Sequence, residues 1–424
     1  MATGRTRILI LGGGFGGVYT ALRLERRLPR DGSVEITLVN RDNFFLFTPM
    51  LHEVAASDLD LTHIVSPIRT LLPKTHLLTG DVTSIDLDAK RVIVRHGLSA
   101  HAHTHEYDHL VLALGSTTNF HGLPGLETHA LCMKSLGDAI HVRNRLIAHL
   151  EEADGECSME ARQPLLTFVV AGGGFAGVET VAGINDFVRE ALAYYPRLSH
   201  ASIRMVLAHG GAELLPELGD TLGRYTREKL VSRGVEVHTG VHVSGVTKDE
   251  VRLSNGMAIA SRFLLWTAGV SPHPLLATLP LTLDRGRVAV DESLRALGRT
   301  DVWALGDCAV VPNPRTGVPH PPTAQHAIRE GRVLADNILA SLAGRPLQPF
   351  RFSTIGQLAA IGRRAGVARV FGITFSGFAA WWLWRTVYLV KLPRFDRKVR
   401  VALDWTLDLF FRKDIVQFDG ERVR

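Results

Sequence analysis

The sequence predicts an α/β fold with two similar domains and an amphipathic C-terminal region, on three observations. The first is a pair of similar stretches, LGGGFGGVYT (11–20) and AGGGFAGVET (171–180). The second is that each stretch follows an apolar strand and opens a helical pattern, as a strand–turn–helix unit does. The third is the tail, residues 361–424, whose net charge is +7 against −1 for the rest of the chain.

Length and composition are those of a globular chain of two or three domains. The chain has 424 residues, of which 46% are hydrophobic and 21% charged, enough apolar material for a large core. Its cysteines, Cys132, Cys157 and Cys308, form no Cys-x-x-Cys pair, which disfavours a disulfide framework or a structural zinc site. The first apolar block, residues 8–11, is too short for a signal peptide. The chain is therefore expected inside the cell.

The first glycine turn predicts a Rossmann-like dinucleotide-binding unit. Gly12 permits a tight turn, Gly14 lets the backbone approach a pyrophosphate, and Gly17 lets helix and strand pack closely. The helix N-terminus then faces the phosphate charge. The next strand, VEITLVN, ends at Asn40, near the usual place of a ribose-binding acid, and an amide makes that hydrogen bond less strongly than a carboxylate.

The second glycine turn repeats the unit with Gly172, Gly174 and Gly177, and its later strand, SIRMVLAHG, ends near His209. Two complete units predict two dinucleotides. A flavin and a nicotinamide are the natural pair, because one passes hydride to the other.

Two further stretches complete a resemblance to the two-dinucleotide-binding flavoproteins, over residues 5–345. YDHLVLALGSTTNF (107–120) is an apolar strand that ends at Gly115, and TDVWALGDCAV (300–310) ends in Gly306 and Asp307. In that family the first turn holds FAD, the second holds NAD(P)H, and the late Asp contacts the ribityl chain of the flavin. The resemblance implies an FAD domain from 1–118 and 286–345, an NAD(P)H domain at 119–285, and a membrane-associating region at 346–424.

Three more stretches resemble type II NADH:quinone oxidoreductases within that family: NFFLFTPMLHEVA (43–55), LLWTAGVSPHPL (264–275) and PPTAQHAIREG (321–331). In the last, Thr323 is a good N-cap. A helix N-terminus aimed at the flavin would stabilise the anion formed when hydride arrives. The resemblance places Ala324 and Gln325 at the flavin and the quinone pocket. The family's second Gln is replaced here by Arg329, which accepts no hydrogen bond.

The two turns differ two residues after their last glycine, where the first has Tyr19 and the second has Glu179. A carboxylate there favours the helix dipole by ~0.3–1 kcal/mol, but that benefit applies equally to the first helix. The resemblance implies a sharper role, because type II NADH dehydrogenases carry a Glu here that reaches toward the nicotinamide and the flavin. It would orient the nicotinamide amide or relay protons that the quinone needs.

The turns and the resemblance together imply a set of site residues. The FAD contacts are Gly12, Gly14, Phe15, Gly16, Gly17, Asn40, Gly115, Asp307, Ala324 and Gln325. The NADH contacts are Gly172, Gly174, Phe175, Gly177, Glu179, His209 and Gly269. Glu179 and Gln325 are the predicted catalytic residues, and no metal is expected. NADPH is not excluded, because Ala208 and His209 stand where an acid often rejects its 2′-phosphate.

The stretch HAHTH puts His101, His103 and His105 on one face of a predicted strand, a candidate metal cluster. The nearby Glu106 falls on the opposite face. A solvated hairpin is therefore the favoured interpretation.

The tail predicts a membrane-docking surface over residues 371–412. Its uncharged run, 370–384, has 15 residues, short of the ~20 needed to span a bilayer. Tryptophans with basic residues favour the membrane interface; they are Trp381, Trp382, Trp384 and Trp405. Later residues form a charged stripe (Asp396, Arg400, Asp404, Asp408, Arg412) and an apolar one (Val399, Leu403, Leu407, Phe410, Phe411), as in an amphipathic helix. Packing on the chain's own body or in a homodimer is the alternative, and nucleic acid is disfavoured.

The expected function is non-proton-pumping oxidation of NADH, with hydride transfer to FAD and two-electron reduction of a membrane quinone, at the cytoplasmic face of the cell membrane. Disulfide and sulfide:quinone reductases work through cysteines, which this sequence does not place suitably. Two alternatives stay open: a soluble NAD(P)H-dependent reductase of a small redox protein, and an NADH-responsive flavoprotein that signals to partners.

Overall fold

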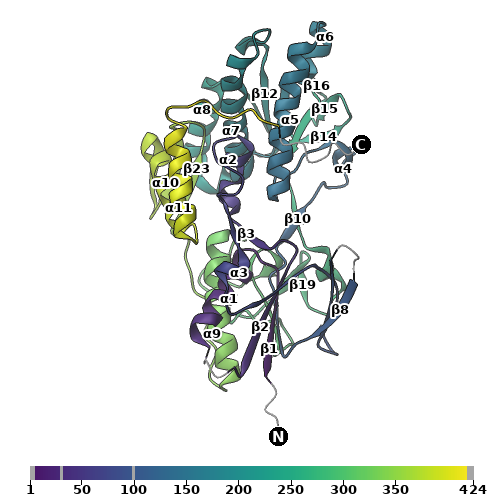
Figure 1. Ribbon diagram of the computed structural model, residues 1–424, viewed down its shortest axis with the longest axis vertical. Helices are drawn as coiled ribbons and strands as arrows, with labels where there is room; N and C mark the ends of the chain where they lie inside the picture. Colours follow the sequence, from purple (N-terminus) through teal and green to yellow (C-terminus); the bar gives the residue numbers. More distant parts are fainter. Residues whose placement is uncertain (1–4, 29–31, 98–100, 418–424) are drawn as a thin grey trace. The chain divides into compact units, whose positions relative to one another are not determined.

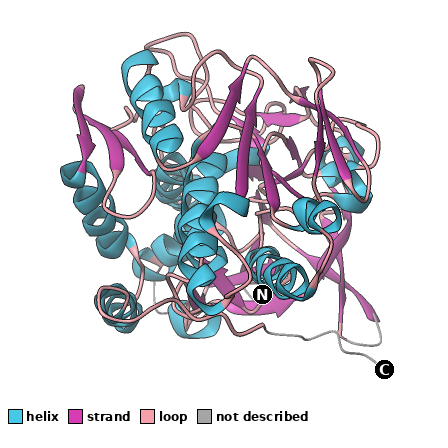
Figure 2. Cartoon of the chain, turned by 90° about the horizontal axis from the view of Figure 1, so that it is seen from above, coloured by secondary structure: helices cyan, strands magenta, loops and turns pink. Residues whose placement is uncertain are grey.

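The computed structural model describes residues 5–28, 32–97 and 101–417, which form two compact units. Unit 1 comprises residues 1–46, 66–117 and 270–354, and unit 2 comprises 47–65, 118–269 and 355–424. Figure 2 shows helices and strands mixed throughout the chain. The C-terminal segment thus belongs to the compact body of unit 2. The predicted division of the chain by bound cofactor stays a prediction.

Unit 1 is built on a five-stranded parallel sheet in the order β21-β9-β1-β2-β5. Helices α1 and α9 lie side by side next to it (Figure 1), and an antiparallel meander, β6-β7-β8, forms a second layer. The elements are β1 (Thr6–Leu11), α1 (Phe15–Arg27), β2 (Val34–Asn40), β3 (Phe44–Leu46), α3 (Ile68–Leu71), β5 (His76–Thr79), β6 (Asp81–Asp86), β7 (Arg91–His96), β8 (His101–Glu106), β9 (His109–Leu112), β19 (Leu283–Asp284), β20 (Arg287–Ala289), β21 (Val302–Ala304), β22 (Ala309–Val310) and α9 (Ala324–Leu342).

Unit 2 repeats the plan with a four-stranded parallel sheet, β13-β12-β11-β17, whose central strand β11 is wholly buried. Helix α7 follows β11, and the short helix α2 packs against both α5 and α7. The elements of this part are α2 (Leu51–Ala55), α4 (Leu126–His129), α5 (Leu136–Gly155), α6 (Met159–Arg162), β11 (Thr167–Ala171), α7 (Phe175–Ala191), β12 (Arg204–His209), α8 (Asp220–Ser232), β13 (Val235–Thr239), β14 (Val243–Val246), β15 (Glu250–Leu253), β16 (Ala258–Ala260) and β17 (Phe263–Trp266).

The C-terminal part of unit 2 is an antiparallel sheet followed by two helices. Its elements are β23 (Gly356–Ala360), β24 (Gly366–Val370), β25 (Ile373–Gly377), α10 (Phe378–Lys391) and α11 (Phe395–Leu407). Helix α10 packs on β23, β24 and β25, and β23 contacts α7. No helix in the described ranges is both long and apolar enough to cross a bilayer. The predicted fold class, two Rossmann-like domains with a C-terminal amphipathic region, is confirmed.

Candidate active site

The carboxyl ends of the strands of unit 1 gather the predicted FAD residues at one edge of the sheet. Strands β1, β9 and β21 are neighbours and parallel, so Gly12, Gly115 and Asp307, which follow them, lie close together. The Oγ of Ser116 donates a hydrogen bond of 2.8 Å to Oδ2 of Asp307. This bond fixes the carboxylate of Asp307 at the edge where a dinucleotide would bind.

The first glycine turn has the shape that a pyrophosphate needs. Gly12 has a φ of +109°, and a Cβ there would lie 2.2 Å from the carbonyl oxygen of Ala113. Beside Gly14, no atom lies within 4 Å of the place of a Cβ. Helix α1 has no acidic residue in its first turn and no side-chain cap, so the positive end of its dipole suits an anion. These residues fit FAD.

The rest of the first turn packs against unit 1 itself. The ring of Phe15 meets Phe45 edge-on at 5.0 Å between centroids. A Cβ on Gly16 would lie 3.1 Å from Leu305, and one on Gly17 would lie 1.9 Å from the carbonyl oxygen of Gly12. Gly17 has no room for a side chain, as close packing of helix on strand requires, and at Gly16 the Leu305 side chain would have to shift slightly.

Asn40 braces the first turn. Its Oδ1 accepts a 2.8 Å hydrogen bond from the backbone N–H of Gly13, and its Nδ2 donates to the carbonyl oxygen of Asp42 at 2.9 Å. The ribose contact proposed for Asn40 would have to be made beside these two bonds.

The second turn repeats that brace with a different side chain. Nδ1 of His209 accepts a 3.1 Å hydrogen bond from the N–H of Gly173, and burial lowers the pKa of His209, so the ring is neutral. Gly172 has a φ of +114°, and Gly174 again has open space beside it. Phe175 begins α7, as Phe15 begins α1, and Gly177 lies in the first turn of α7, as Gly17 does in α1.

Gly269 follows β17 at the same edge of the second sheet. A Cβ there would lie 2.5 Å from Nε2 of His121 and 2.6 Å from the carbonyl oxygen of Asn119. Only glycine fits at this position.

Glu179 lies buried in α7 and is held by the C-terminal part of unit 2. Its Oε1 accepts hydrogen bonds from the N–H of Ala360, at 3.0 Å, and from Nε1 of Trp384, at 2.8 Å. Oε2 lies 4.0 Å from Nδ1 of His52. Burial raises the pKa of Glu179 to about 8, against the two hydrogen bonds and with a contribution from the charge of Glu53. A carboxyl group with this pKa can donate and recover a proton near neutral pH.

A second buried acid, Glu53, was missed by the sequence reasoning. It lies on α2, is 5% exposed, and its Oε2 accepts a 3.1 Å hydrogen bond from Nε1 of Trp405. Burial raises its pKa to about 8. Only the context MLHEVA, an acid between apolar residues, could have indicated it.

The prediction that the tail tryptophans lie at a membrane interface is wrong for Trp384 and Trp405, whose N–H groups donate to Glu179 and Glu53 inside unit 2.

Helix α9 carries Ala324 and Gln325 in its first turn, as expected. Thr323 precedes it, and its hydroxyl contacts Nδ1 of His326 at 2.8 Å and does not cap the helix. Arg329, one turn on, donates to the carbonyl oxygen of Gln325 at 2.8 Å, and its guanidinium lies 4.1 Å from the centre of the Phe352 ring.

Glu330 of α9 was also missed. It is buried, and its Oε2 accepts a 2.8 Å hydrogen bond from the N–H of Gly306. Burial raises its pKa to about 7. The bond ties α9 to the Gly-Asp turn, so the two segments that carry Asp307 and Gln325 are fixed to each other.

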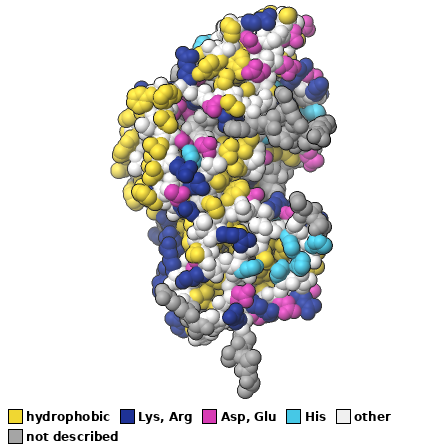
Figure 3. All heavy atoms as spheres, in the orientation of Figure 1, with side chains coloured by type: hydrophobic (Ala, Val, Ile, Leu, Met, Phe, Trp, Pro, Cys, Tyr) yellow, Lys and Arg dark blue, Asp and Glu magenta, His cyan; other side chains and the backbone are white. Residues whose placement is uncertain are grey.

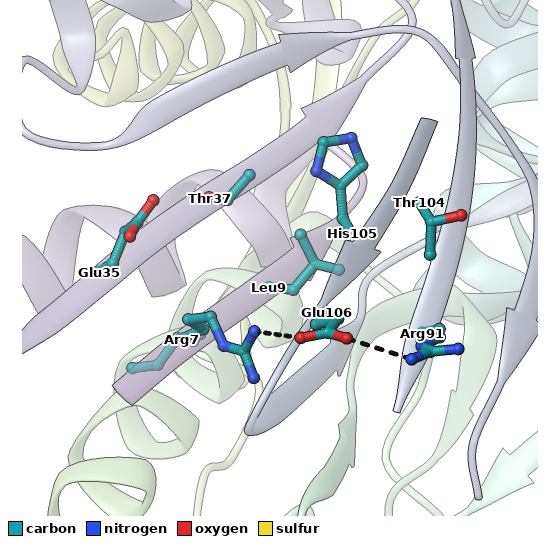
Figure 4. Close-up of a pocket in the computed structure, with 9 residues that line it drawn as sticks. Arg7, Leu9, Glu35, Thr37, Arg91, Thr104, His105 and Glu106 are labelled. Atoms are coloured by element: carbon teal, nitrogen blue, oxygen red, sulfur yellow. Dashed lines mark hydrogen bonds and ion pairs between the residues drawn. The ribbon is translucent and has the colours of Figure 1, made fainter. Parts of the chain in front are cut away.

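A surface cleft lies at the amino ends of strands β1 and β2 of unit 1, away from the glycine turn. It has a volume of about 610 Å³, and Glu106 in its wall pairs with Arg7 at 2.8 Å and Arg91 at 3.4 Å (Figure 4). These side chains are 41–56% exposed, so the cleft is open and ion-paired.

The histidine stretch forms β8, whose side chains are mostly exposed (Figure 3), so the predicted solvated hairpin is confirmed. The ring of His103 stacks on His96 of β7 at 4.5 Å between centroids. Among the residues that the structure describes, no three His, Cys, Asp or Glu side chains form a group that could hold a metal ion.

Comparisons with known proteins show the family of this chain. A family model described as pyridine nucleotide-disulphide oxidoreductase matches residues 6–331, and one described as NDH2 C-terminal domain matches residues 355–414. A type II NADH:quinone oxidoreductase of Mycobacterium tuberculosis is 33% identical over 419 residues, which are 95% of this chain and 88% of that protein. A demethylphylloquinone reductase of Synechocystis is 33% identical and covers 96% of each chain.

The fold is shared with solved structures. The structure of NDH2 from Plasmodium falciparum in complex with NADH superposes with a TM-score of 0.89 at 21% identity, over 97% of this chain and 100% of that one. A sulfide:quinone oxidoreductase of Aquifex aeolicus gives a TM-score of 0.73 at 20% identity, over 98% and 100%.

Proposed function

We propose that this chain, which belongs to the type II NADH:quinone oxidoreductases of the pyridine nucleotide-disulphide oxidoreductase family, oxidises NADH and reduces a membrane quinone without pumping protons. FAD, held by unit 1, supplies the hydride acceptor that links the two substrates. The first turn, Asn40, Gly115 and Asp307 hold it, and the second turn with Gly269 holds NADH. The single observation that carries the proposal is Glu179, a buried carboxyl group that can exchange a proton near pH 7, on the nicotinamide-binding unit.

Glu179 and Gln325 are the proposed catalytic residues. The reaction NADH + H⁺ + quinone → NAD⁺ + quinol takes up one proton beyond the hydride, and protonated Glu179 is the group that donates it to the quinone oxygen. Gln325 lies in the first turn of α9 and offers an amide to a quinone carbonyl. Arg329 is turned onto Gln325 and Phe352, and this supports a structural part for Arg329 in place of the family's second Gln.

The C-terminal helices present an apolar surface outward, and this supports docking on a membrane. Figure 3 shows hydrophobic side chains gathered over α10 and α11. From residue 371 onward, in and beside β25, in the two helices and in the residues after them, the exposed large apolar side chains are Phe371, Ile373, Phe375, Phe378, Trp382, Val390, Phe395, Val399, Leu403, Leu407, Leu409, Phe410, Phe411 and Val416. Two acids of the charged stripe face the protein instead: Asp404 pairs with His63, and Asp408 lies 3.7 Å from Arg363. Arg400 and Arg412 are exposed. An amphipathic helix with its apolar face outward gains ~25 cal/mol per Å² on leaving water.

The cytoplasmic face of the cell membrane is the proposed location, because NADH is made inside the cell. A second copy of this chain, bound through the same apolar surface in a homodimer, is the alternative to the membrane. Either partner would bury the exposed apolar residues named above.

The test uses the full-length enzyme with bound FAD. We expect it to oxidise NADH with a ubiquinone or menaquinone analogue and to sediment with liposomes of anionic lipid, only partly released by high salt because salt leaves the apolar contribution intact. Phe371→Ser/Phe395→Ser/Phe410→Ser should stay in the supernatant and still reduce ferricyanide. Met159→Ser/Val231→Ser, which removes exposed apolar side chains elsewhere on unit 2, is the matched control.

Wild-type enzyme that stays in the supernatant with all liposomes would contradict membrane docking. A dimer in sedimentation velocity would then assign the surface to a second copy, and a monomer would favour the soluble reductase. A very slow rate with every quinone and with ferricyanide would favour the signalling flavoprotein.

A further inference from the structure

A small cavity in unit 2 connects Glu179 with charged groups that have no part in the proposed reaction. It has a volume of about 40 Å³ and is lined by His52, Glu53, Asp58, Glu179, Arg385 and Lys413. Asp186, Arg363 and Asp408 complete its charged lining. A water molecule needs roughly 10–15 Å³ of such space and two to four polar partners, so the cavity has room for about two or three waters.

Glu53 and Glu179 stand at this cavity in equivalent settings. Each is less than a tenth exposed, and each accepts one indole N–H bond, Glu53 from Trp405 on α11 and Glu179 from Trp384 on α10. Burial raises the pKa of both carboxyl groups to about 8. Both therefore carry a proton at neutral pH and release it only slightly above. The charge of Glu53 is one of the causes that raise the pKa of Glu179.

Charged groups on the other side of the cavity continue toward the surface. Lys413 pairs with Asp58 at 2.7 Å and donates to the carbonyl oxygen of Ala56 at 3.1 Å. Nε of Arg385 is buried and meets no hydrogen-bond partner among the described residues. A buried N–H without a protein partner is usually satisfied by water, which is a second reason to place water here. His52 adds no charge, because burial and the nearby Lys413 lower its pKa to about 3.

We propose that Glu53 is a positioning residue that reloads Glu179 with a proton through the water of this cavity. This inference rests on the proposed function, in which protonated Glu179 gives its proton to the reduced quinone. The O–H bond of Glu179 breaks as the quinol O–H bond forms, and Glu179 is left as a carboxylate. The proton of Glu53 then passes along the water to Glu179. Glu53 recovers a proton from solvent through the groups around Asp58, so one proton is taken up per turnover and the electrons are unaffected.

The test is Glu53→Gln in the full-length enzyme with bound FAD. The amide oxygen of Gln still accepts the N–H of Trp405, so the substitution keeps this hydrogen bond and removes only the transferable proton. We expect reduction of the flavin by NADH and reduction of ferricyanide within about twofold of wild type. The quinone step should slow by about 10- to 100-fold, at the low end of what general acid catalysis contributes. The alkaline limb of its pH profile should move to lower pH, because a charge that raises the pKa of Glu179 is gone.

Two further variants complete the design. Glu228→Gln removes an exposed carboxylate from α8 of unit 2 that does not line the cavity, and it should behave as wild type. Glu53→Asp keeps a transferable proton and should recover part of the lost rate. In the background of Glu179→Gln, Glu53→Gln should slow the quinone step by less than twofold, since two residues in series are not additive.

The outcomes separate this inference from the function on which it rests. If Glu179→Gln slows the quinone step and Glu53→Gln changes neither its rate nor its pH profile, the relay is overturned and the function stands. If Glu179→Gln keeps the wild-type quinone rate, the proposed role of Glu179 fails. A slow Glu53→Gln enzyme with an unchanged pH profile and no recovery in Glu53→Asp shows a structural role and also overturns the relay. Should Glu53→Gln lose FAD, the solvent deuterium isotope effect on the wild-type quinone step decides, and its absence overturns the relay.

Discussion

The two glycine turns share one backbone design, and the helices that follow them differ in a group that can exchange a proton. In both, the first glycine (Gly12 or Gly172) has a φ near +110°, and the last (Gly17 or Gly177) has no room for a Cβ. A side chain from the end of the next strand accepts the N–H of Gly13 in the first turn and of Gly173 in the second. Two residues after the last glycine, the first helix has Tyr19 and the second has Glu179. The turn therefore determines where a dinucleotide binds, and this later residue determines whether the helix also carries a group that exchanges protons.

Tyr19 has a packing role. Its ring meets Phe45 edge-on at 6.4 Å, and the guanidinium of Arg332 lies 5.8 Å from the ring centre. Burial raises the pKa of Tyr19 above its usual value of 10, so it keeps its proton at every physiological pH. Glu179, by contrast, is buried among groups that leave its pKa near neutrality. Only the second helix thus carries a group that can exchange a proton during turnover.

The largest effect is expected from adding one methyl group to either turn. In Gly172→Ala the Cβ would lie 2.6 Å from Oγ1 of Thr267, at a φ that side chains rarely adopt. We expect FAD to stay bound and the affinity for NADH to fall by about 100-fold, or ~2.7 kcal/mol. In Gly12→Ala the Cβ would lie 2.2 Å from the oxygen of Ala113, and FAD itself should be lost. Flavin absorbance and NADH titration measure both.

The pair also tests whether the two turns hold different ligands. Gly172→Ala enzyme that loses FAD but keeps NADH would reverse the assignment of the turns. Gly12→Ala enzyme that purifies with a full complement of FAD would show that the turn tolerates the methyl group.

A smaller effect is expected on stability as a function of pH. The folded pKa of Glu179, about 8, is higher than the ordinary 4.5, so the folded chain holds a proton that the unfolded chain has released. The free energy of unfolding must then fall as pH rises from about 4.5 to 8 and level off above. Glu179→Gln removes this loss. We expect its melting temperature to rise relative to wild type by several degrees between pH 5 and pH 8, because each ~1 kcal/mol shifts the melting temperature of a domain of this size by about 2–4 °C.

Tyr19→Phe is the control for that measurement, because neither side chain titrates between pH 5 and pH 8. Its melting curve should shift by the same amount at both values. If Glu179→Gln and wild type differ equally at pH 5 and pH 8, Glu179 is ionised in the folded protein and the contrast between the turns loses its chemical basis.

Local sequence patterns predicted the turns and the strands around them, because each glycine is required by the close approach of atoms that lie a few residues away or on a neighbouring strand. They also predicted an amphipathic tail. Periodicity shows that a helix has two faces, but not which residues meet the protein, and here Asp404 and Asp408 of the charged stripe face inward. The indole bonds of Trp384 and Trp405, and the burial of Glu53, join segments up to about 350 residues apart. Such pairings depend on tertiary packing, which no short pattern records.

The smallest effect is expected where the braces of the two turns differ, Asn40 in the first and His209 in the second. A neutral imidazole neither repels nor attracts the 2′-phosphate of NADPH, so we expect wild type to prefer NADH by less than ~1000-fold in kcat/KM, because no buried group is left unpaired by the wrong coenzyme. His209→Asn reproduces the brace of the first turn and should change kcat/KM by less than threefold for either coenzyme. His209→Glu adds a carboxylate, which should raise the preference for NADH at least tenfold. A preference beyond ~1000-fold in wild type would mean that another group rejects NADPH. In that case His209 would only hold the N–H of Gly173, as Asn40 holds the N–H of Gly13, and would have no part in choosing the coenzyme.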